Sequence, residues 1–190
     1  MNTPGIDAVR GNESMELFDV YTADRKKTGR TMERGERTPP GFYRMIVHVC
    51  IFGEDGRLLI QQRQPIKKAW PNMWDVSVGG CAVAGDSSRS AAERETREEL
   101  GLSIDLSDAC PALTVYWERV IDDIYILTRS VEPASLRLQP EEVQAIRWAE
   151  KAEILRLIDD GLFVPYDKSF IEYLFFRRDH SGSLTRSERP

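Results

Sequence analysis

The sequence predicts an α+β fold in which helices cover both faces of a mixed β-sheet, giving an α/β/α sandwich. Two observations lead to this fold class. Short segments rich in β-branched and aromatic residues follow one another between residues 44 and 149, separated by turn signals. Helical apolar spacing occurs once in the middle of this run and again near the end of the chain. Strands in a run, interrupted by one helix and followed by others, favour this layered packing.

The first four expected strands pair as two hairpins. Segments 16–21 and 29–34 are expected to form the first hairpin around a short polar turn. Segment 44–52 is apolar and β-branched along most of its length, as in a buried strand. The turn signal at 53–56, which is flanked by glycines, then leads into the partner strand at 57–63.

The middle of the chain is expected to hold one strand and one long helix. Segment 73–78 alternates in polarity and is expected to be a strand that ends at a glycine pair. Asp86 is expected to cap a helix that runs to about Leu100, because its side chain suits an N-cap. Gly101 is placed to close that helix in a left-handed conformation.

The last third of the chain is expected to complete the sheet and supply the remaining helices. Segments 112–120, 123–128 and 142–149 have the composition of strands. Segments 152–159 and 166–177 show apolar residues at helical spacing.

The chain is expected to form one main domain with short appendages. Residues 1–13 and 179–190 are polar and are expected to be flexible tails. Residues 14–40 are expected to form a separate hairpin and loop. The Pro-Pro-Gly sequence at 39–41 then marks the entry to the main domain, 41–178.

Composition excludes several classes of protein. The net charge of −5 argues against a partner that is a nucleic-acid polymer or an anionic membrane. Three widely spaced cysteines indicate a reducing compartment, the cytoplasm, rather than a disulfide scaffold. Two histidines are too few for a His-rich metal cage, so any metal would depend on oxygen ligands. The oligomeric state stays open.

The helix at 86–100 carries the densest set of ionisable residues. Glu95, Glu98 and Glu99 stand at i, i+3 and i+4 and therefore share one helix face. Their mutual repulsion costs roughly 0.2–0.5 kcal/mol per pair, and a hard divalent cation such as Mg²⁺ would reverse its sign. The alternative is an ordinary solvated acidic face, supported by Arg94 and Arg97.

The residues around this helix resemble a known motif. Gly80 is followed after five residues by Asp86, and after seven more by the run Arg-Glu-Thr-Arg-Glu-Glu-Leu-Gly-Leu at 94–102. This pattern resembles the Nudix box, G-x5-E-x7-R-E-U-x-E-E-x-G-U, where U is bulky and aliphatic. Two positions depart from it: Asp86 replaces a glutamate, and Thr96 replaces an aliphatic residue.

The resemblance implies a Nudix fold and the hydrolysis of a diphosphate linkage in a small molecule by water, with Mg²⁺ or Mn²⁺ as cofactor. The implied metal ligands are the Gly80 carbonyl, Glu98 and Glu99. Glu95 is implied to be the catalytic base or a further ligand. Arg94 would orient a glutamate, and Asp86 would play a supporting part.

Outside the box, the chain has a run from Arg63 through Lys67 to Pro71, followed by Trp74, Ser77-Val78, Glu141-Glu142-Val143 and Trp148. These residues resemble matching segments of the type I isopentenyl-diphosphate isomerases, a branch of the same superfamily, and the similarity covers about residues 45–157. The resemblance implies that Arg63 and Lys67 contact the substrate diphosphate; the alternative is two solvated charges. Gly79, however, stands where the isomerases have a catalytic cysteine, and Cys81 stands where they have a metal-binding histidine. We therefore expect a hydrolase. The alternatives are an isomerase and a non-catalytic Nudix binding module.

A further metal-binding carboxylate is expected outside the box. Asp123 is the first choice, because the isomerase resemblance places an active-site glutamate there, and Glu118 is the second. In a regular strand Asp122 would point the opposite way from Asp123. The alternative is that both aspartates form a polar turn between strands. His48 is expected to be a structural residue of its strand.

Overall fold

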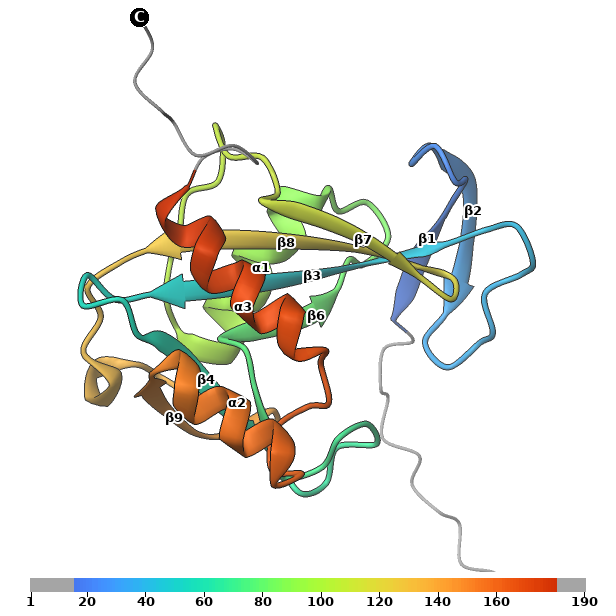
Figure 1. Ribbon diagram of the computed structural model, residues 1–190. Helices are drawn as coiled ribbons and strands as arrows, with labels where there is room; N and C mark the ends of the chain where they lie inside the picture. Colours follow the sequence, from blue (N-terminus) through green and yellow to red (C-terminus); the bar gives the residue numbers. More distant parts are fainter. Residues whose placement is uncertain (1–15, 181–190) are drawn as a thin grey trace, which may run out of the picture.

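The computed structural model describes residues 16–180, so the two expected tails lie outside the described residues except for 179 and 180. A seven-stranded mixed sheet forms the middle layer (Figure 1). The elements, in chain order, are β1 Leu17–Tyr21, β2 Lys27–Glu33, β3 Arg44–Phe52, β4 Leu58–Arg63, β5 Trp74–Asp75, β6 Val78–Cys81, α1 Ser88–Leu100, β7 Leu113–Trp117, β8 Val120–Thr128, β9 Val143–Ala149, α2 Lys151–Asp159 and α3 Lys168–Asp179, with a 3-10 turn at Pro133–Ser135.

The central strand β3 organises the sheet. It runs parallel to β8 and antiparallel to β6, and it meets β4 only at the pair Phe52 and Leu58. Beyond that pair β3 and β4 diverge, with β4 pairing β5 and β9. The hydroxyl of Ser77 bridges the gap: it accepts from Ile51 N at 2.8 Å and donates to Leu59 O at 2.5 Å. The divergence leaves room for side chains between the two halves of the sheet.

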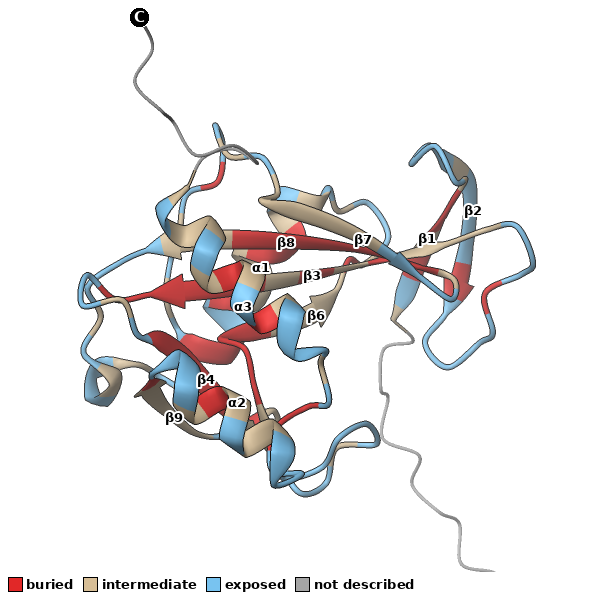
Figure 2. Cartoon of the chain, in the orientation of Figure 1, coloured by how far each residue is buried: buried red, intermediate tan, exposed pale blue. Residues whose placement is uncertain are grey.

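Two apolar layers hold helices on opposite faces of the sheet, and the α+β fold class is confirmed. One layer joins α1, through Ala91, Ala92 and Leu100, to β3 residues such as Val47. The other joins α2 and α3 to residues such as Phe52 on the opposite face. Figure 2 shows the buried residues concentrated along β3 and β8, at the centre of these layers.

The hairpin of β1 and β2 forms a small sheet of its own, as expected for residues 16–34. Phe18, Val20 and Met32 make a separate apolar cluster on it. The hairpin is attached to the main sheet by an antiparallel bridge between Tyr21 and Tyr43. No helix among residues 16–180 is both long and apolar enough to cross a bilayer.

Three details of the expected elements are wrong. Segment 73–78 is two short strands, β5 and β6, because the chain crosses at Ser77 from pairing with β4 to pairing with β3. Helix α1 is capped by Ser87, not by Asp86: Ser87 Oγ accepts from Ser90 N, and Ser90 Oγ accepts from Ser87 N. Strand β8 begins at Val120 rather than at residue 123, so it includes both aspartates.

Candidate active site around helix α1

Helix α1 buries a small, mostly apolar stripe and turns its carboxylates toward β6. Ala91, Ala92 and Leu100 are fully buried against the sheet. Thr96, the polar departure from the box, is also buried, and its hydroxyl donates to Ala92 O at 2.7 Å. This hydrogen bond satisfies the extra hydroxyl, so threonine is accommodated where an aliphatic residue is usual.

Arg94 joins three acidic side chains of the motif. Its Nη1 donates to Glu95 Oε1 and to Glu98 Oε2, both at 2.9 Å. Its Nη2 donates to Asp86 Oδ2 at 3.0 Å and to the Cys81 carbonyl at 2.9 Å. The guanidinium therefore fixes the two glutamates relative to the end of β6 through charge-assisted hydrogen bonds.

Gly80 allows Glu95 to approach the backbone of β6. A Cβ atom at Gly80 would lie 2.1 Å from Glu95 Cδ, which is far inside van der Waals contact. Burial raises the pKa of Glu95, although Arg94 opposes that shift. Any side chain at position 80 would displace this carboxylate, so the glycine is a steric requirement of the site.

Glu99 is the most deeply buried carboxylate of the site, at 4% exposed. Burial, with a contribution from the charge of Glu95, raises its pKa to about 8. Gln61 Nε2 donates to Glu99 Oε2 at 3.0 Å, whereas Gln61 Oε1 has no partner among residues 16–180. By contrast, the Glu98 side chain is 47% exposed. The helix spacing did not reveal that these neighbours differ so much in burial, nor did it point to Gln61.

The donor set suits a hard divalent cation, although the side chains are not gathered into a cage. Glu95, Glu98, Glu99 and the Gly80 carbonyl provide oxygen atoms only, as Mg²⁺ prefers. The raised pKa of Glu99 reports crowded negative charge in a desolvated place, which a cation would relieve. Within residues 16–180, no three acidic, histidine or cysteine side chains already converge as metal ligands.

On the face of the sheet opposite α1, His48 occupies the space beside Gly79. A Cβ atom at Gly79 would lie 2.9 Å from His48 Cδ2 and 3.0 Å from its Nε2. His48 Nδ1 lies 2.8 Å from Asp122 Oδ1, and its Nε2 lies 3.3 Å from the Tyr166 hydroxyl. Burial alone would lower the pKa of His48, but Asp122 outweighs it and the pKa rises to about 9. A cysteine at position 79 would collide with this ring.

Arg63 and Lys67 are both engaged with acidic side chains. Arg63 Nη1 lies 3.3 Å from Asp75 Oδ2, and its Nε donates to the Ala69 carbonyl. The Lys67 ammonium contacts Glu142. Asp75 also accepts from the Tyr166 hydroxyl, at 2.9 Å. The structure thus gives both basic residues protein partners, none of which is a glutamate of α1.

Asp123 shares the α1 face of the sheet but is held by other residues. Val47 of β3 pairs with Asp123 of β8 on one side and with Gly80 of β6 on the other. The Cα atoms of residues 80 and 123 are therefore two strand spacings apart, about 10 Å. Both carboxylate oxygens of Asp123 accept from Arg25, at 2.8 and 2.5 Å, and Thr114 donates a further bond at 2.6 Å. Burial alone would raise its pKa, yet these bonds lower it.

The neighbouring acidic residues are placed differently. Asp122 points to the opposite face, toward His48, as expected for adjacent strand positions. The polar-turn alternative for the two aspartates is wrong, because the turn between β7 and β8 lies at Glu118 and Arg119 instead. Glu118 has a φ of 47° there.

Comparison with known proteins identifies the family. The family model described as NUDIX domain matches residues 42–183. An uncharacterised Nudix hydrolase of Listeria innocua is 45% identical over 161 residues, which cover 85% of this chain and 94% of the relative. The crystal structure of a Deinococcus radiodurans protein covers 84% of this chain and 99% of its own, with a TM-score of 0.67 and 24% identity, and supports the fold.

A mixed sheet with an acidic helix packed on its central strands thus defines a Nudix-type domain. The chain belongs to the Nudix hydrolase family, enzymes that act on pyrophosphate bonds. An isopentenyl-diphosphate Delta-isomerase of Salmonella arizonae is also similar, with 34% identity over 113 residues, covering 56% of this chain and 61% of the isomerase.

Proposed function

We propose that this enzyme hydrolyses a diphosphate linkage in a nucleoside or other small organic diphosphate derivative, with Mg²⁺ or Mn²⁺ as cofactor. The observation that carries the proposal is the arrangement around Arg94, which holds Glu95 and Glu98 beside the end of β6. A bound divalent cation would neutralise the diphosphate and lower the pKa of a coordinated water. Gly80 through its carbonyl, Glu98 and Glu99 would hold the cation.

Glu95 is our candidate for the group that takes a proton from the attacking water. It is the carboxylate that packs against Gly80, and burial already raises its pKa, as a general base at neutral pH requires. Arg94 then acts as a positioning residue, and Asp86 restrains Arg94 from the other side. We retain Asp123 as a further ligand, since it lies on the same face of the sheet; Arg25 would first have to release it.

Arg63 and Lys67 are proposed to contact the substrate phosphates. Arg63 is paired with Asp75 of β5, and Lys67 with Glu142, the residue before β9; a phosphate could replace either carboxylate as partner. We also place the enzyme in the cytoplasm, since Cys50, Cys81 and Cys110 are all free thiols.

The test is a screen of purified protein with Mg²⁺ and Mn²⁺ against nucleotide sugars, nucleoside di- and triphosphates, dinucleotides and prenyl diphosphates, following phosphate release. Glu98→Gln keeps the size of the side chain but removes its charge, so turnover should fall by orders of magnitude. Arg97→Gln, on the exposed part of the same helix, is the matched control and should stay active. Full activity of Glu98→Gln at saturating Mg²⁺ would contradict the proposal, and hydrolysis of no compound would favour a binding module.

The same samples test the isomerase alternative. Gly79 has no side chain to move a proton, and His48 fills the space that a cysteine would need. We therefore expect no deuterium exchange into isopentenyl diphosphate above background. Deuterium exchange catalysed by the pure protein would favour the isomerase alternative.

A further inference from the structure

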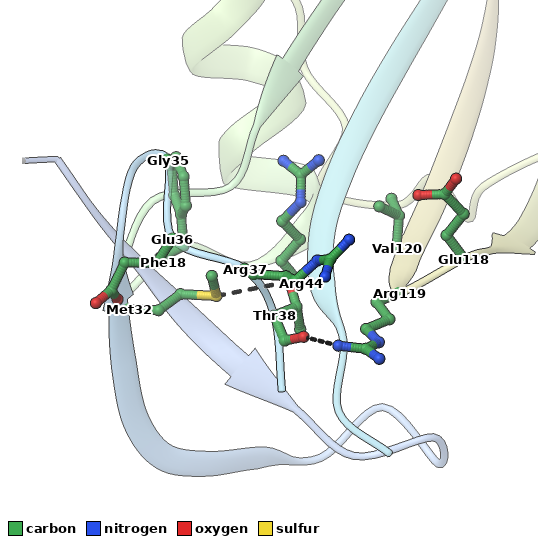
Figure 3. A pocket seen from close by; sticks show the side chains of 10 residues that line it. All are labelled: Phe18, Met32, Gly35, Glu36, Arg37, Thr38, Arg44, Glu118, Arg119 and Val120. Atoms are coloured by element: carbon green, nitrogen blue, oxygen red, sulfur yellow. Dashed lines mark hydrogen bonds between the residues drawn. The ribbon is translucent and has the colours of Figure 1, made fainter. Parts of the chain in front are cut away.

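A cavity of about 640 Å³ lies between the N-terminal hairpin and the main sheet (Figure 3). The loop after β2 forms one wall, and the start of β3 with the turn between β7 and β8 forms the other. Figure 3 shows the guanidinium groups of Arg37 and Arg44 between these walls, with Glu118 on the far side. None of these residues belongs to the Nudix motif.

The lining is rich in arginines that have no acidic partner. Arg37, Arg44 and Arg119 all line the cavity, and none of them forms an ion pair with any residue in the range 16–180. Arg119 donates to the Thr38 carbonyl, and Arg44 Nη1 lies 3.5 Å from Cys81 Sγ, a weak acceptor.

Other basic residues near the active site, unlike these three arginines, do form ion pairs. Arg25, Arg63, Lys67 and Arg94 each contact a carboxylate. Arg44 is partly buried at the start of β3, and a partly buried guanidinium without a counter-charge is unfavourable unless an anion completes it. The lining therefore holds three arginines against two carboxylates, Glu36 and Glu118, and none of the arginines is paired with either of them.

The cavity lies near the end of β6, and Arg44 shares the face of β3 that carries His48, since the two are four residues apart on that strand. Arg44 contacts Cys81, the residue after Gly80, and it precedes Val47, the partner of Gly80 on β3, by three positions. At about 3.3 Å per residue this places the Arg44 Cα roughly 10 Å along the strand from that row. A diphosphate derivative would reach the cavity only if it extends about 10 Å past the scissile linkage and around the end of β6.

We infer that this cavity binds a second phosphate-type group of the substrate, one that is separate from the linkage being hydrolysed. The inference rests on the proposed function, because it assigns this second group to the substrate of the proposed hydrolysis. The ligand class is a small molecule that carries a phosphomonoester or terminal phosphate in addition to its diphosphate bond. The arginine guanidinium groups recognise it by charge-assisted hydrogen bonds.

The test measures the binding of inorganic pyrophosphate to the full chain by calorimetry in EDTA. Without divalent cations the glutamates of α1 repel the anion, so binding reports basic sites alone. Arg37→Gln and Arg44→Gln should each weaken binding by at least about ten-fold. Arg57→Gln removes an arginine from the turn between β3 and β4 and should leave the affinity unchanged.

Two further variants keep the test decisive. Glu118→Gln removes a carboxylate from the cavity wall and should tighten binding, a gain that a misfolded protein cannot produce. Arg119→Gln removes the third arginine of the lining and should also weaken binding, whereas a site elsewhere would not respond to it. Absence of saturable binding, or equal affinity in wild type and the Arg37→Gln/Arg44→Gln double variant, would overturn the inference. Because the titration involves no turnover, its result is independent of whether hydrolysis is found.

Discussion

Replacing Glu99 with glutamine should stabilise the metal-free protein while abolishing metal-dependent hydrolysis. The carboxyl group is almost completely buried, and its pKa of about 8 means that the folded protein holds a proton there at neutral pH. A glutamine carries no charge to desolvate. Its amide can also donate to Gln61 Oε1, the buried atom that lacks a partner within residues 16–180.

The size and pH dependence of the effect follow from linkage. Between the ordinary pKa of 4.5 and about 8, the unfolded chain releases the Glu99 proton while the folded protein keeps it. The free energy of unfolding of the wild type therefore falls by about 1.4 kcal/mol per pH unit across this window, up to about 5 kcal/mol in total. The advantage of Glu99→Gln should grow over the same window and become constant above it.

The assay is urea denaturation in EDTA, followed by tryptophan fluorescence, at a series of pH values from about 5 to about 9. Glu98→Gln is the matched control: its side chain is 47% exposed, so its effect on stability should stay below about 1 kcal/mol. A stability difference between Glu99→Gln and wild type that does not change with pH, or a less stable variant at high pH, would refute the reasoning. It would show that Glu99 is already charged in the folded, metal-free protein.

Four other substitutions test separate parts of the site. Gly80→Ala should cost about 1–3 kcal/mol of stability in a denaturant titration and most of the activity, because its Cβ meets the Glu95 carboxylate; wild-type values for both would contradict this steric account. Arg63→Ala and Lys67→Ala should each raise KM by roughly ten-fold in steady-state kinetics, and unchanged KM and kcat would leave them as structural ion pairs. Asp123→Asn should lower kcat with saturating Mn²⁺ if that carboxylate completes the metal site, and a wild-type kcat would remove it from the site.

Local sequence patterns predicted most of the elements because each pattern has a local cause. The run 44–52 is β-branched and apolar, and it is β3 with those same bounds. Gly101 closes α1 with a φ of 65°, as its lack of a side chain allows. Ser87, not Asp86, caps the helix because the Asp86 carboxylate accepts hydrogen bonds from Arg94 instead. Arg94 is eight residues further along the chain, and a capping pattern covers only the first turn.

The candidate site was predictable only where a single helix determines it. The spacing of Glu95 and Glu99 places both on one face, but their burial depends on β4 and β6, which pack from elsewhere in the chain. His48 and Asp122 meet because β3 and β8 run parallel, a pairing between segments more than seventy residues apart. No short-range signal in the sequence could have joined them.

The contact between Arg25 and Asp123 links the N-terminal hairpin to strand β8 of the main sheet. Arg25 belongs to the hairpin outside the residues that match the family, whereas Asp123 lies within the matched range, 42–183. A buried aspartate deprived of its guanidinium is costly, so the two positions should vary together among relatives. A relative that lacks the hairpin should carry a neutral residue at the position of Asp123, or meet its charge with a cation from another source.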